Sequence, residues 1–140
     1  MKIVVDTNVT SELMRRAPDA AVRAWVLAAS PTDLFTTSIT VAEILYGLER
    51  LPPGQRKDVL RATARETFAA FAERVLPFDA AAAGRYGSIV DGRERAGRPI
   101  DGFDAQIASI CQVHGATLAT RNTRDFEDTG VQLVDPWTSP

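Results

Sequence analysis

The sequence has 140 residues, 45% of them hydrophobic and 24% charged, which is the size and composition of a single globular domain spanning residues 1–140. No run approaches the ~20 apolar residues of a membrane span, and no basic-plus-apolar leader opens the chain, so we expect no membrane association. Cys111 is the only cysteine, which excludes an internal disulfide and is typical of a reducing, cytoplasmic setting.

The charge balance argues against a protein that binds nucleic acid over its whole surface. The formal net charge is −2, although 16 residues are basic. All of these except Lys2 and Lys57 are arginines, whose planar guanidinium bonds phosphate oxygens in pairs. We therefore expect any phosphate contacts to be local and to be made by arginine.

The first predicted element is a strand. Residues 3–5 are β-formers that run without polar alternation into Asp6, a pattern typical of a parallel strand buried on both faces. Asp6 then lies at the carboxyl end of the strand, where open α/β sheets carry their chemistry. The structural alternative for Asp6 is an Asx turn that starts the next helix, a helix that we expect Asn8 to cap.

The rest of the chain alternates helices with short strands. Pro52-Pro53-Gly54 is the clearest break between two helices. This order predicts an α/β fold, a three-layer α/β/α arrangement around a central, mainly parallel sheet. The predicted helices cover residues 19–31, 39–51, 55–74, 79–96 and 101–114, and the predicted strands cover residues 34–37, 117–120 and 131–134. Residues 75–78 form either a short edge strand or an extended link, and residues 121–128 form a loop.

Two further acids begin elements that could face the same edge of the sheet. Glu43 lies in the first turns of the helix 39–51, and Asp104 lies in the first turn of the helix 101–114. We expect Asp101 to cap that helix, as we expect Asp79 to cap the helix 79–96. Glu43 and Asp104 each have a structural alternative. Thr40 and Glu43 have the spacing of a capping box, and a negative group in a first turn is favoured by ~0.3–1 kcal/mol.

Taken together, Asp6, Glu43 and Asp104 point to a metal site. Two carboxylates ~4 Å apart repel by roughly 4 kcal/mol at an effective dielectric near 20, so a cluster without a cation is costly or becomes protonated. Mg²⁺ relieves this repulsion with one or two carboxylates, water and phosphate oxygens. It needs no His or Cys ligand, which suits a chain with one residue of each kind.

Four segments, in this order and spacing, carry a family resemblance. They are VVDTN at 4–8, ITVAEILYG at 39–47, IDGFDAQIA at 100–108 and LATRNTRDF at 118–126. The series closely resembles the PIN-domain ribonucleases and, within them, the VapC toxins of type II VapBC toxin–antitoxin systems. The likeness extends over essentially the whole chain, to Pro136-Trp137.

The resemblance implies a PIN-like fold and an endoribonuclease that depends on Mg²⁺ or Mn²⁺. The family's fourth acidic position falls on Asn122, a departure that leaves a second metal ion open and makes Asp125 the candidate replacement. The resemblance assigns the metal to Asp6, Glu43 and Asp104, catalysis to these three together with Asp125, and the polar contacts that orient them to Thr7, Asn8, Thr120 and Asn122.

The mechanism that we expect is hydrolysis by an activated water. Asp6 and Asp104 would hold the principal ion, while Glu43 would bind it through water or act as the base. The resemblance implies products with a 5′-phosphate and a 3′-hydroxyl. Two alternatives stay open at this point: a phosphatase with Asp6 as nucleophile, although such sites usually have a second acid where Asn8 stands, and a catalytically weak PIN-like module that binds RNA or protein.

The resemblance also implies partners: a cognate VapB-type antitoxin, an RNA substrate (tRNA, rRNA or mRNA) and a second copy in a homodimer. Val22, Trp25 and Leu45 are candidate contacts in the dimer. Arg121 and Arg124 flank the predicted active-site loop and are the first choices for binding RNA. Further candidates for phosphate contacts are Arg15, Arg16, Arg93, Arg95 and Arg98.

Overall fold

A five-stranded sheet forms the centre of the computed structural model, which describes residues 1–139. The strand order is β3-β2-β1-β4-β5, and every neighbouring pair is parallel. The predicted α/β fold is therefore confirmed, with a sheet that is wholly rather than mainly parallel. The strands are β1 (Ile3–Val5), β2 (Leu34–Thr37), β3 (Val75–Leu76), β4 (Thr117–Ala119) and β5 (Leu133–Val134).

The helices follow the predicted order, with ends that differ by a few residues. The main local difference is at the first helix, where Asp6 rather than Asn8 is the N-cap. The helices are α1 (Thr7–Leu13), α2 (Ala20–Ala28), α3 (Ser38–Glu49), α4 (Gln55–Phe71), α5 (Ala80–Arg95) and α6 (Gly102–His114), with 3-10 turns η1 (Pro31–Asp33) and η2 (Thr123–Phe126).

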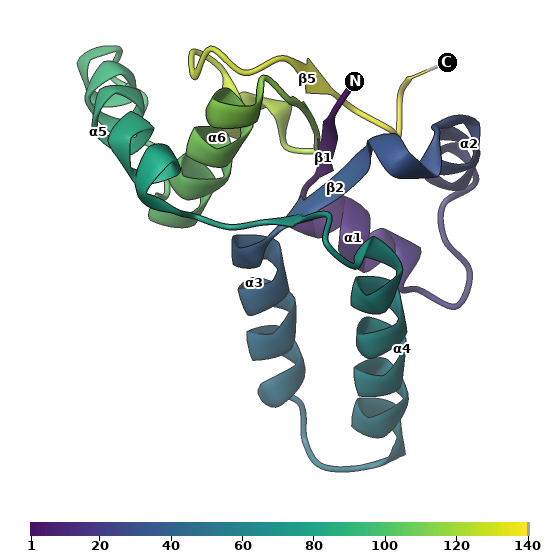
Figure 1. The fold of residues 1–140 in the computed structure, drawn as a ribbon. Coiled ribbons are helices and arrows are strands. Elements are labelled where there is room, and N and C mark those ends of the chain that lie inside the picture. Colours follow the sequence, from purple (N-terminus) through teal and green to yellow (C-terminus); the bar gives the residue numbers. More distant parts are fainter. Residues whose placement is uncertain (140) are drawn as a thin grey trace.

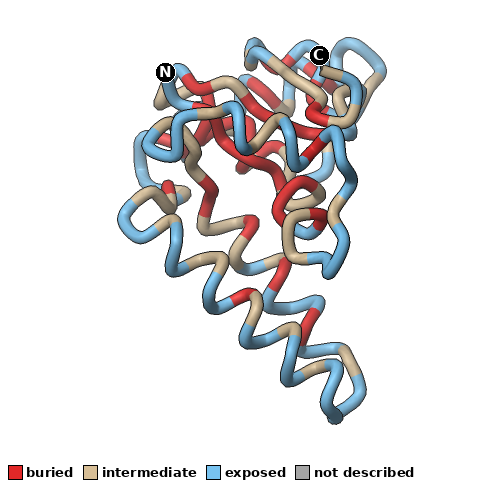
Figure 2. The backbone as a smooth tube through the Cα atoms, turned by 90° about the vertical axis from the view of Figure 1, so that its right-hand side faces the viewer, coloured by how far each residue is buried: buried red, intermediate tan, exposed pale blue. Residues whose placement is uncertain are grey.

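Helices cover both faces of the sheet (Figure 1). Side chains alternate between the faces along β1, so that Val4 packs in the cluster beneath α5 and α6, whereas Ile3 and Val5 pack beneath α1 and α2. The α3–α4 hairpin extends away from the sheet, and Figure 2 shows that buried residues are concentrated in the body of the molecule and thin out toward the hairpin tip.

The topology places the carboxyl ends of β1, β2 and β4 at one edge of the sheet. β1 is the middle strand and pairs with β2 on one side and β4 on the other. Helices α1 and α3 begin directly after β1 and β2, so their N-termini lie at that edge. Among residues 1–139, no helix is long and apolar enough to cross a membrane.

Candidate functional site

Asp6 is held in a fixed orientation where β1 ends. Its carboxylate accepts hydrogen bonds of 2.8 Å from both the Thr7 backbone N–H and the Thr120 hydroxyl. The Asn8 amide lies 3.5 Å from the same carboxylate. The side chain is 5% exposed, and this burial raises the pKa of Asp6 despite the hydrogen bonds from Thr120 and Thr7. Asp6 therefore caps α1 and also presents a buried carboxylate at the sheet edge.

Glu43 turns toward the start of α1 rather than capping its own helix. The N-cap of α3 is Thr37, whose hydroxyl accepts from the Thr40 backbone N–H at 3.1 Å. The capping box between Thr40 and Glu43 is thus not formed. Instead the Thr7 hydroxyl donates to Glu43 Oε1 at 2.8 Å. Burial raises the pKa of Glu43 against the effect of that bond, and the charge of Asp6 adds to the rise.

Asp104 lies in the first turn of α6, and its pKa is also raised. Asp101 takes the role of N-cap, accepting from the Phe103 backbone N–H at 3.1 Å, which leaves Asp104 free for the cleft. Burial raises the pKa of Asp104 to about 7. The negative charges that add to the rise are, in order, those of Asp6, Asp101, Asp125 and Glu43.

The three predicted acids line one cavity of about 260 Å³. The other residues of its lining are Thr7, Asn8 and Asn122. Over residues 1–139, no three His, Cys, Asp or Glu side chains lie close enough together to hold a metal ion directly. Mg²⁺ usually binds through one or two carboxylates and several waters. The donor set fits such an ion, and its positive charge would relieve the repulsion that raises the Asp104 pKa.

The loop after β4 brings Asn122 to the cavity and leaves Asp125 beside it. The Thr120 hydroxyl accepts from the Asn122 backbone N–H at 3.1 Å. Asp125 is exposed on η2 and is absent from the cavity lining, yet its charge raises the pKa of both Asp6 and Asp104. Asp125 therefore affects these two acids through its negative charge, without lining the cavity.

Arg121 and Arg124 stand exposed on the same loop. The Arg121 backbone N–H donates to Asn8 Oδ1 at 3.2 Å, which ties the residue to the rim of the cavity. Its guanidinium carbon lies 4.9 Å from the centre of the Trp137 ring. Both arginines thus remain accessible for the predicted contact with RNA.

Arg93 is a correction to the predicted phosphate contacts. It is only 4% exposed, and its guanidinium donates to the backbone oxygens of Asp125 (2.7 Å), Glu127 (3.0 Å) and Arg98 (2.6 Å). It fastens the end of α5 to the η2 loop. The signal was present in the sequence, since Arg93 continues the buried stripe of Ala82 and Ile89 at helical spacing.

Three other predicted phosphate contacts are engaged in ion pairs. Arg15 pairs with Glu12, Arg95 with Asp91, and Arg98 with both Glu127 and Asp128. These surface pairs are weak, but they account for the positions of the three side chains without a nucleic acid.

The expected dimer contacts differ from one another in exposure. Val22 is fully buried in the cluster beneath α1 and α2, so its prediction as a contact is wrong. Trp25 packs half-buried against the same cluster. Leu45 is 48% exposed on α3 and remains available.

Two contributors to the site were missed by the sequence analysis. Asp101 was read only as a helix cap, yet its charge raises the pKa of Glu43 and Asp104. The Thr40 hydroxyl lies 3.2 Å from the Thr7 hydroxyl, within the chain of polar groups that reaches Glu43. No spacing rule predicts such a contact, because it joins residues brought together only by packing.

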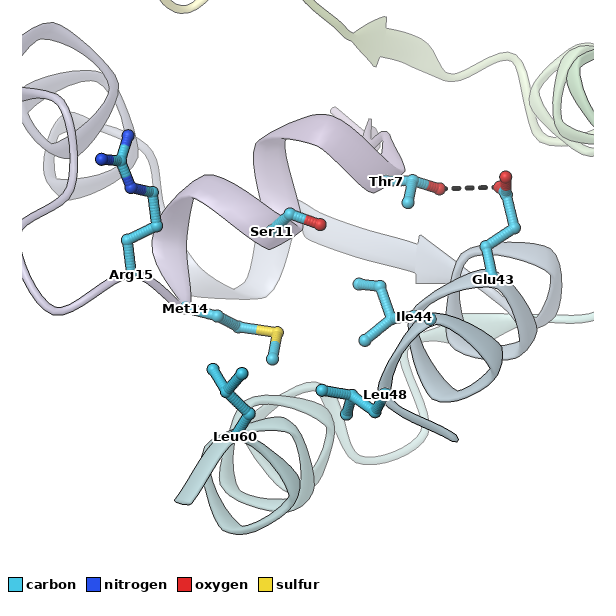
Figure 3. A pocket seen from close by; sticks show the side chains of 9 residues that line it. Thr7, Ser11, Met14, Arg15, Glu43, Ile44, Leu48 and Leu60 are labelled. Carbon is cyan, nitrogen blue, oxygen red and sulfur yellow. Dashed lines mark hydrogen bonds between the residues drawn. The ribbon is translucent and has the colours of Figure 1, made fainter. Parts of the chain in front are cut away.

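An apolar groove of about 280 Å³ adjoins the acids (Figure 3). The Thr7–Glu43 hydrogen bond lies at one end of it. Beyond this bond the walls come from α1, α3 and α4, so the acidic cleft opens onto an apolar surface. The groove is lined there by Met14, Ile44, Leu48 and Leu60.

Comparison with known proteins agrees with this geometry. Residues 3–132 match the PIN domain family. The chain is 40% identical over 136 residues to the VapC ribonuclease Y4jK of Sinorhizobium fredii, covering 96% of this chain and 97% of the relative. It is 30% identical over 139 residues to the tRNA(fMet)-specific endonuclease VapC of Shigella flexneri, covering 98% of each. A solved structure, FitAB bound to an IR36 DNA fragment, superposes with a TM-score of 0.92 at 35% identity, covering 99% of this chain and 97% of that one.

Proposed function

The chain belongs to the PIN-domain family and, within it, to the VapC-type toxins, and on this premise we propose that it is a metal-dependent endoribonuclease toxin of the cytoplasm. It hydrolyses RNA phosphodiester bonds and is held in check by a VapB-type antitoxin. The observation that carries the proposal is the cavity where Asp6, Glu43 and Asp104 meet from three separate elements. Acids whose charges raise one another's pKa are unfavourable neighbours, and their clustering in a cavity is typical of a functional site.

The cofactor in this proposal is Mg²⁺ or Mn²⁺. Asp6 and Asp104 are the residues that would hold it, with Glu43 contributing through water. When bound, a divalent ion neutralises charge on the phosphate and lowers the pKa of water. Hard oxygen donors are the ligands that both ions prefer, and the cavity lining supplies them.

The residues of the chain have separable tasks. Thr120 and Thr7 fix the orientation of Asp6 through hydrogen bonds of 2.8 Å. Thr7 also bonds Glu43 at 2.8 Å, so a single residue sets the relative positions of two acids. The raised pKa of Glu43 makes it a stronger base than a free carboxylate. Glu43 therefore takes a proton from the attacking water as its oxygen bonds to phosphorus. The P–O3′ bond breaks, O3′ takes up a proton from solvent to become the 3′-hydroxyl, and the phosphate stays on the 5′ end of the other fragment.

The assembly follows from the family. FitAB, the solved structure that superposes on this chain with a TM-score of 0.92, is bound to a DNA fragment. By analogy, the present toxin pairs with a small antitoxin and acts as a homodimer. The RNA cleaved is a tRNA, rRNA or mRNA, and the specificity for tRNA(fMet) in one relative's name belongs to that relative.

Cleavage of a defined RNA panel tests the function. Wild type and Asp6→Asn are incubated with 5′- and 3′-labelled tRNA, rRNA fragments and mRNA, in EDTA, Mg²⁺ or Mn²⁺. We expect cleavage by the wild type only, with a divalent ion, leaving 5′-phosphate ends. Equal activity in both proteins would remove the assignment. A trapped phospho-aspartyl enzyme would indicate a phosphatase, and RNA binding without cleavage would indicate a binding module.

A further inference from the structure

Two exposed aromatic rings lie close in the sequence to two of the acids. Tyr46 is 65% exposed and Phe103 is 52% exposed. Tyr46 lies one helical turn after Glu43 on α3, and Phe103 immediately precedes Asp104 on α6. The elements that position two of the acids therefore also position the two rings, at the same edge of the sheet.

The rings share a cavity with the active site. Tyr46, Phe103, Ala42 and Glu43 line a hollow of about 480 Å³. Glu43 lines this hollow and also the acidic cavity, so the two spaces adjoin at this residue. A group seated between the rings would lie directly beside a phosphate bound at the acids.

Neither ring is needed to build the core. The hydrophobic clusters found in the part of the chain that the structure describes contain neither Tyr46 nor Phe103. Aromatic side chains carry large apolar areas that are normally buried in a core or an interface. Their exposure next to the proposed catalytic cleft indicates that they bind a ligand with an apolar face of similar size.

A cation completes the surface. The Arg50 guanidinium carbon lies 5.7 Å from the centre of the Tyr46 ring, so a positive charge stands beside one of the two rings. A flat apolar face beside a positive group suits a nucleotide, because its base can stack while its phosphate meets the guanidinium. A purely apolar helix from another protein would offer no polar partner to Arg50.

We propose that Tyr46 and Phe103 form a base-binding subsite, in which an unpaired RNA base next to the scissile phosphate stacks against the aromatic surface. The assignment rests on the ribonuclease function proposed above and adds a substrate class to it. Bases inside a duplex are already stacked on their neighbours, so the subsite selects single-stranded segments. Because every base has a π face, the selection depends little on sequence.

Binding measured without divalent ions tests the subsite separately from cleavage. The probe is a fluorescein-labelled single-stranded oligoribonucleotide spanning a cleavage site of the wild type, or a mixed-sequence 12-mer if no cleavage is found, with anisotropy measured in EDTA. Tyr46→Leu and Phe103→Leu keep an apolar side chain and remove the ring. Tyr46→Trp restores a ring, and Leu45→Ala is the matched control, since Leu45 is exposed on the same helix but outside the cavity.

We expect each leucine variant to bind roughly 5- to 150-fold more weakly than the wild type, the range that corresponds to the loss of a stacking ring. Tyr46→Trp and Leu45→Ala should bind within about 2-fold of the wild type. A series of oligonucleotides, each with one abasic position, should contain one member for which wild type and leucine variants bind equally. That position is the one whose base occupies the subsite.

Several results would overturn the subsite. One is equal RNA affinity of wild type and both leucine variants, and another is an abasic series without effect at any position. If sedimentation instead shows that Tyr46→Leu and Leu45→Ala both dissociate a dimer while RNA affinity is unchanged, the surface belongs to a second copy. If RNA binding depends on the rings but the protein never cleaves RNA, the subsite stands and the nuclease function is rejected. If the protein cleaves RNA equally well with and without the rings, the nuclease function stands and the subsite is rejected.

Discussion

Asp6 and Asp104 face the same cavity but are supported in different ways. Asp6 is nearly inaccessible, and its carboxylate accepts bonds from Thr7 and Thr120. Asp104 is half-buried, and the causes of its raised pKa are burial and the charges of four other acids, with no hydrogen bond among them. Hydrogen bonds thus hold the Asp6 carboxylate in place, whereas the charge of Asp104 is left to be neutralised by a bound group.

The difference separates orientation from charge. Hydrogen bonds to a carboxylate favour its charged form, so the surroundings of Asp6 offset part of the cost of burying it. Around Asp104 every charged neighbour disfavours ionisation. A divalent cation is the simplest group whose charge would favour the ionised form of Asp104. Each of the following substitutions changes Asp6, Asp104 or the surroundings of one of them.

The largest effect is expected from removing either carboxylate. Asp6→Asn and Asp104→Asn should each lower the rate of RNA cleavage by at least about 100-fold, because loss of a supporting contact alone typically costs about 10- to 100-fold at a metal site. The control is Asp91→Asn, an exposed acid paired with Arg95 on α5, which should cleave at the wild-type rate. Initial rates on a labelled RNA give the comparison, and a fully active Asp104→Asn would contradict it.

Removing the hydroxyl that orients Asp6 should have the next largest effect. Thr120→Val keeps the shape of a fully buried side chain but deletes its 2.8 Å bond to Asp6. We expect activity and metal affinity about 10- to 100-fold lower, with Thr120→Ser near wild type because it keeps the hydroxyl. Thr138→Val, at an exposed position, controls for the loss of a hydroxyl elsewhere. Equal activity in Thr120→Val and wild type would show that Asp6 needs no such support.

The stability of the metal-free protein should depend on the Asp104 charge. Its pKa rises from 3.8 to about 7 on folding, so the folded state holds a proton that the unfolded chain releases. This contribution is fully present below pH ~4 and is lost as the pH rises through about 7. After discounting for partial exposure, the loss is about 1–2 kcal/mol.

Thermal unfolding in EDTA measures that loss. Asp104→Asn should melt at the same temperature as wild type near pH 4.5 and about 3–8 °C higher at pH 8. Adding Mg²⁺ at pH 8 should raise the melting temperature of the wild type more than that of the variant. A difference between the two proteins that stays constant from pH 4.5 to pH 8 would rule out the charge effect.

The smallest effect is expected from adding an acid at position 122. Asn122 lines the cavity and is exposed, so Asn122→Asp should fold normally. It should bind Mn²⁺ several-fold more tightly and, without metal, should melt at a lower temperature than wild type at pH 8, because it adds charge next to Asp104. Arg124→Ala on the same loop is a control that leaves the acids intact. Weaker Mn²⁺ binding by Asn122→Asp would contradict the assignment.

The sequence was sufficient for the fold and for the convergence of the acids, for a physical reason. Hydrophobic runs and caps located the elements, and parallel strands bring their carboxyl ends to one edge whatever the details of packing. The position of Asp6 at this edge could therefore be predicted from the fact that it directly follows the strand at residues 3–5. Asp79 and Asp101 were likewise predicted as caps, and both cap their helices.

The side-chain contacts could not be predicted in the same way. Thr7 bonds Glu43 across 36 positions of the chain, and such a contact depends on how α1 and α3 pack. Arg93 looked like a surface charge because arginine is rarely buried, although its position in the helical stripe indicated otherwise. Asp125 was expected in the cavity, but the path of η2 directs its backbone toward Arg93 and leaves its side chain outside the lining.

Calorimetric titration of Mn²⁺ into the wild type, Asp104→Asn and Asp91→Asn at pH 7.5 tests the shared cation site most directly. The account predicts saturable binding by wild type and Asp91→Asn with equal affinity, and binding at least about 10-fold weaker by Asp104→Asn. Equal affinity in all three proteins, or no binding by the wild type, would contradict it.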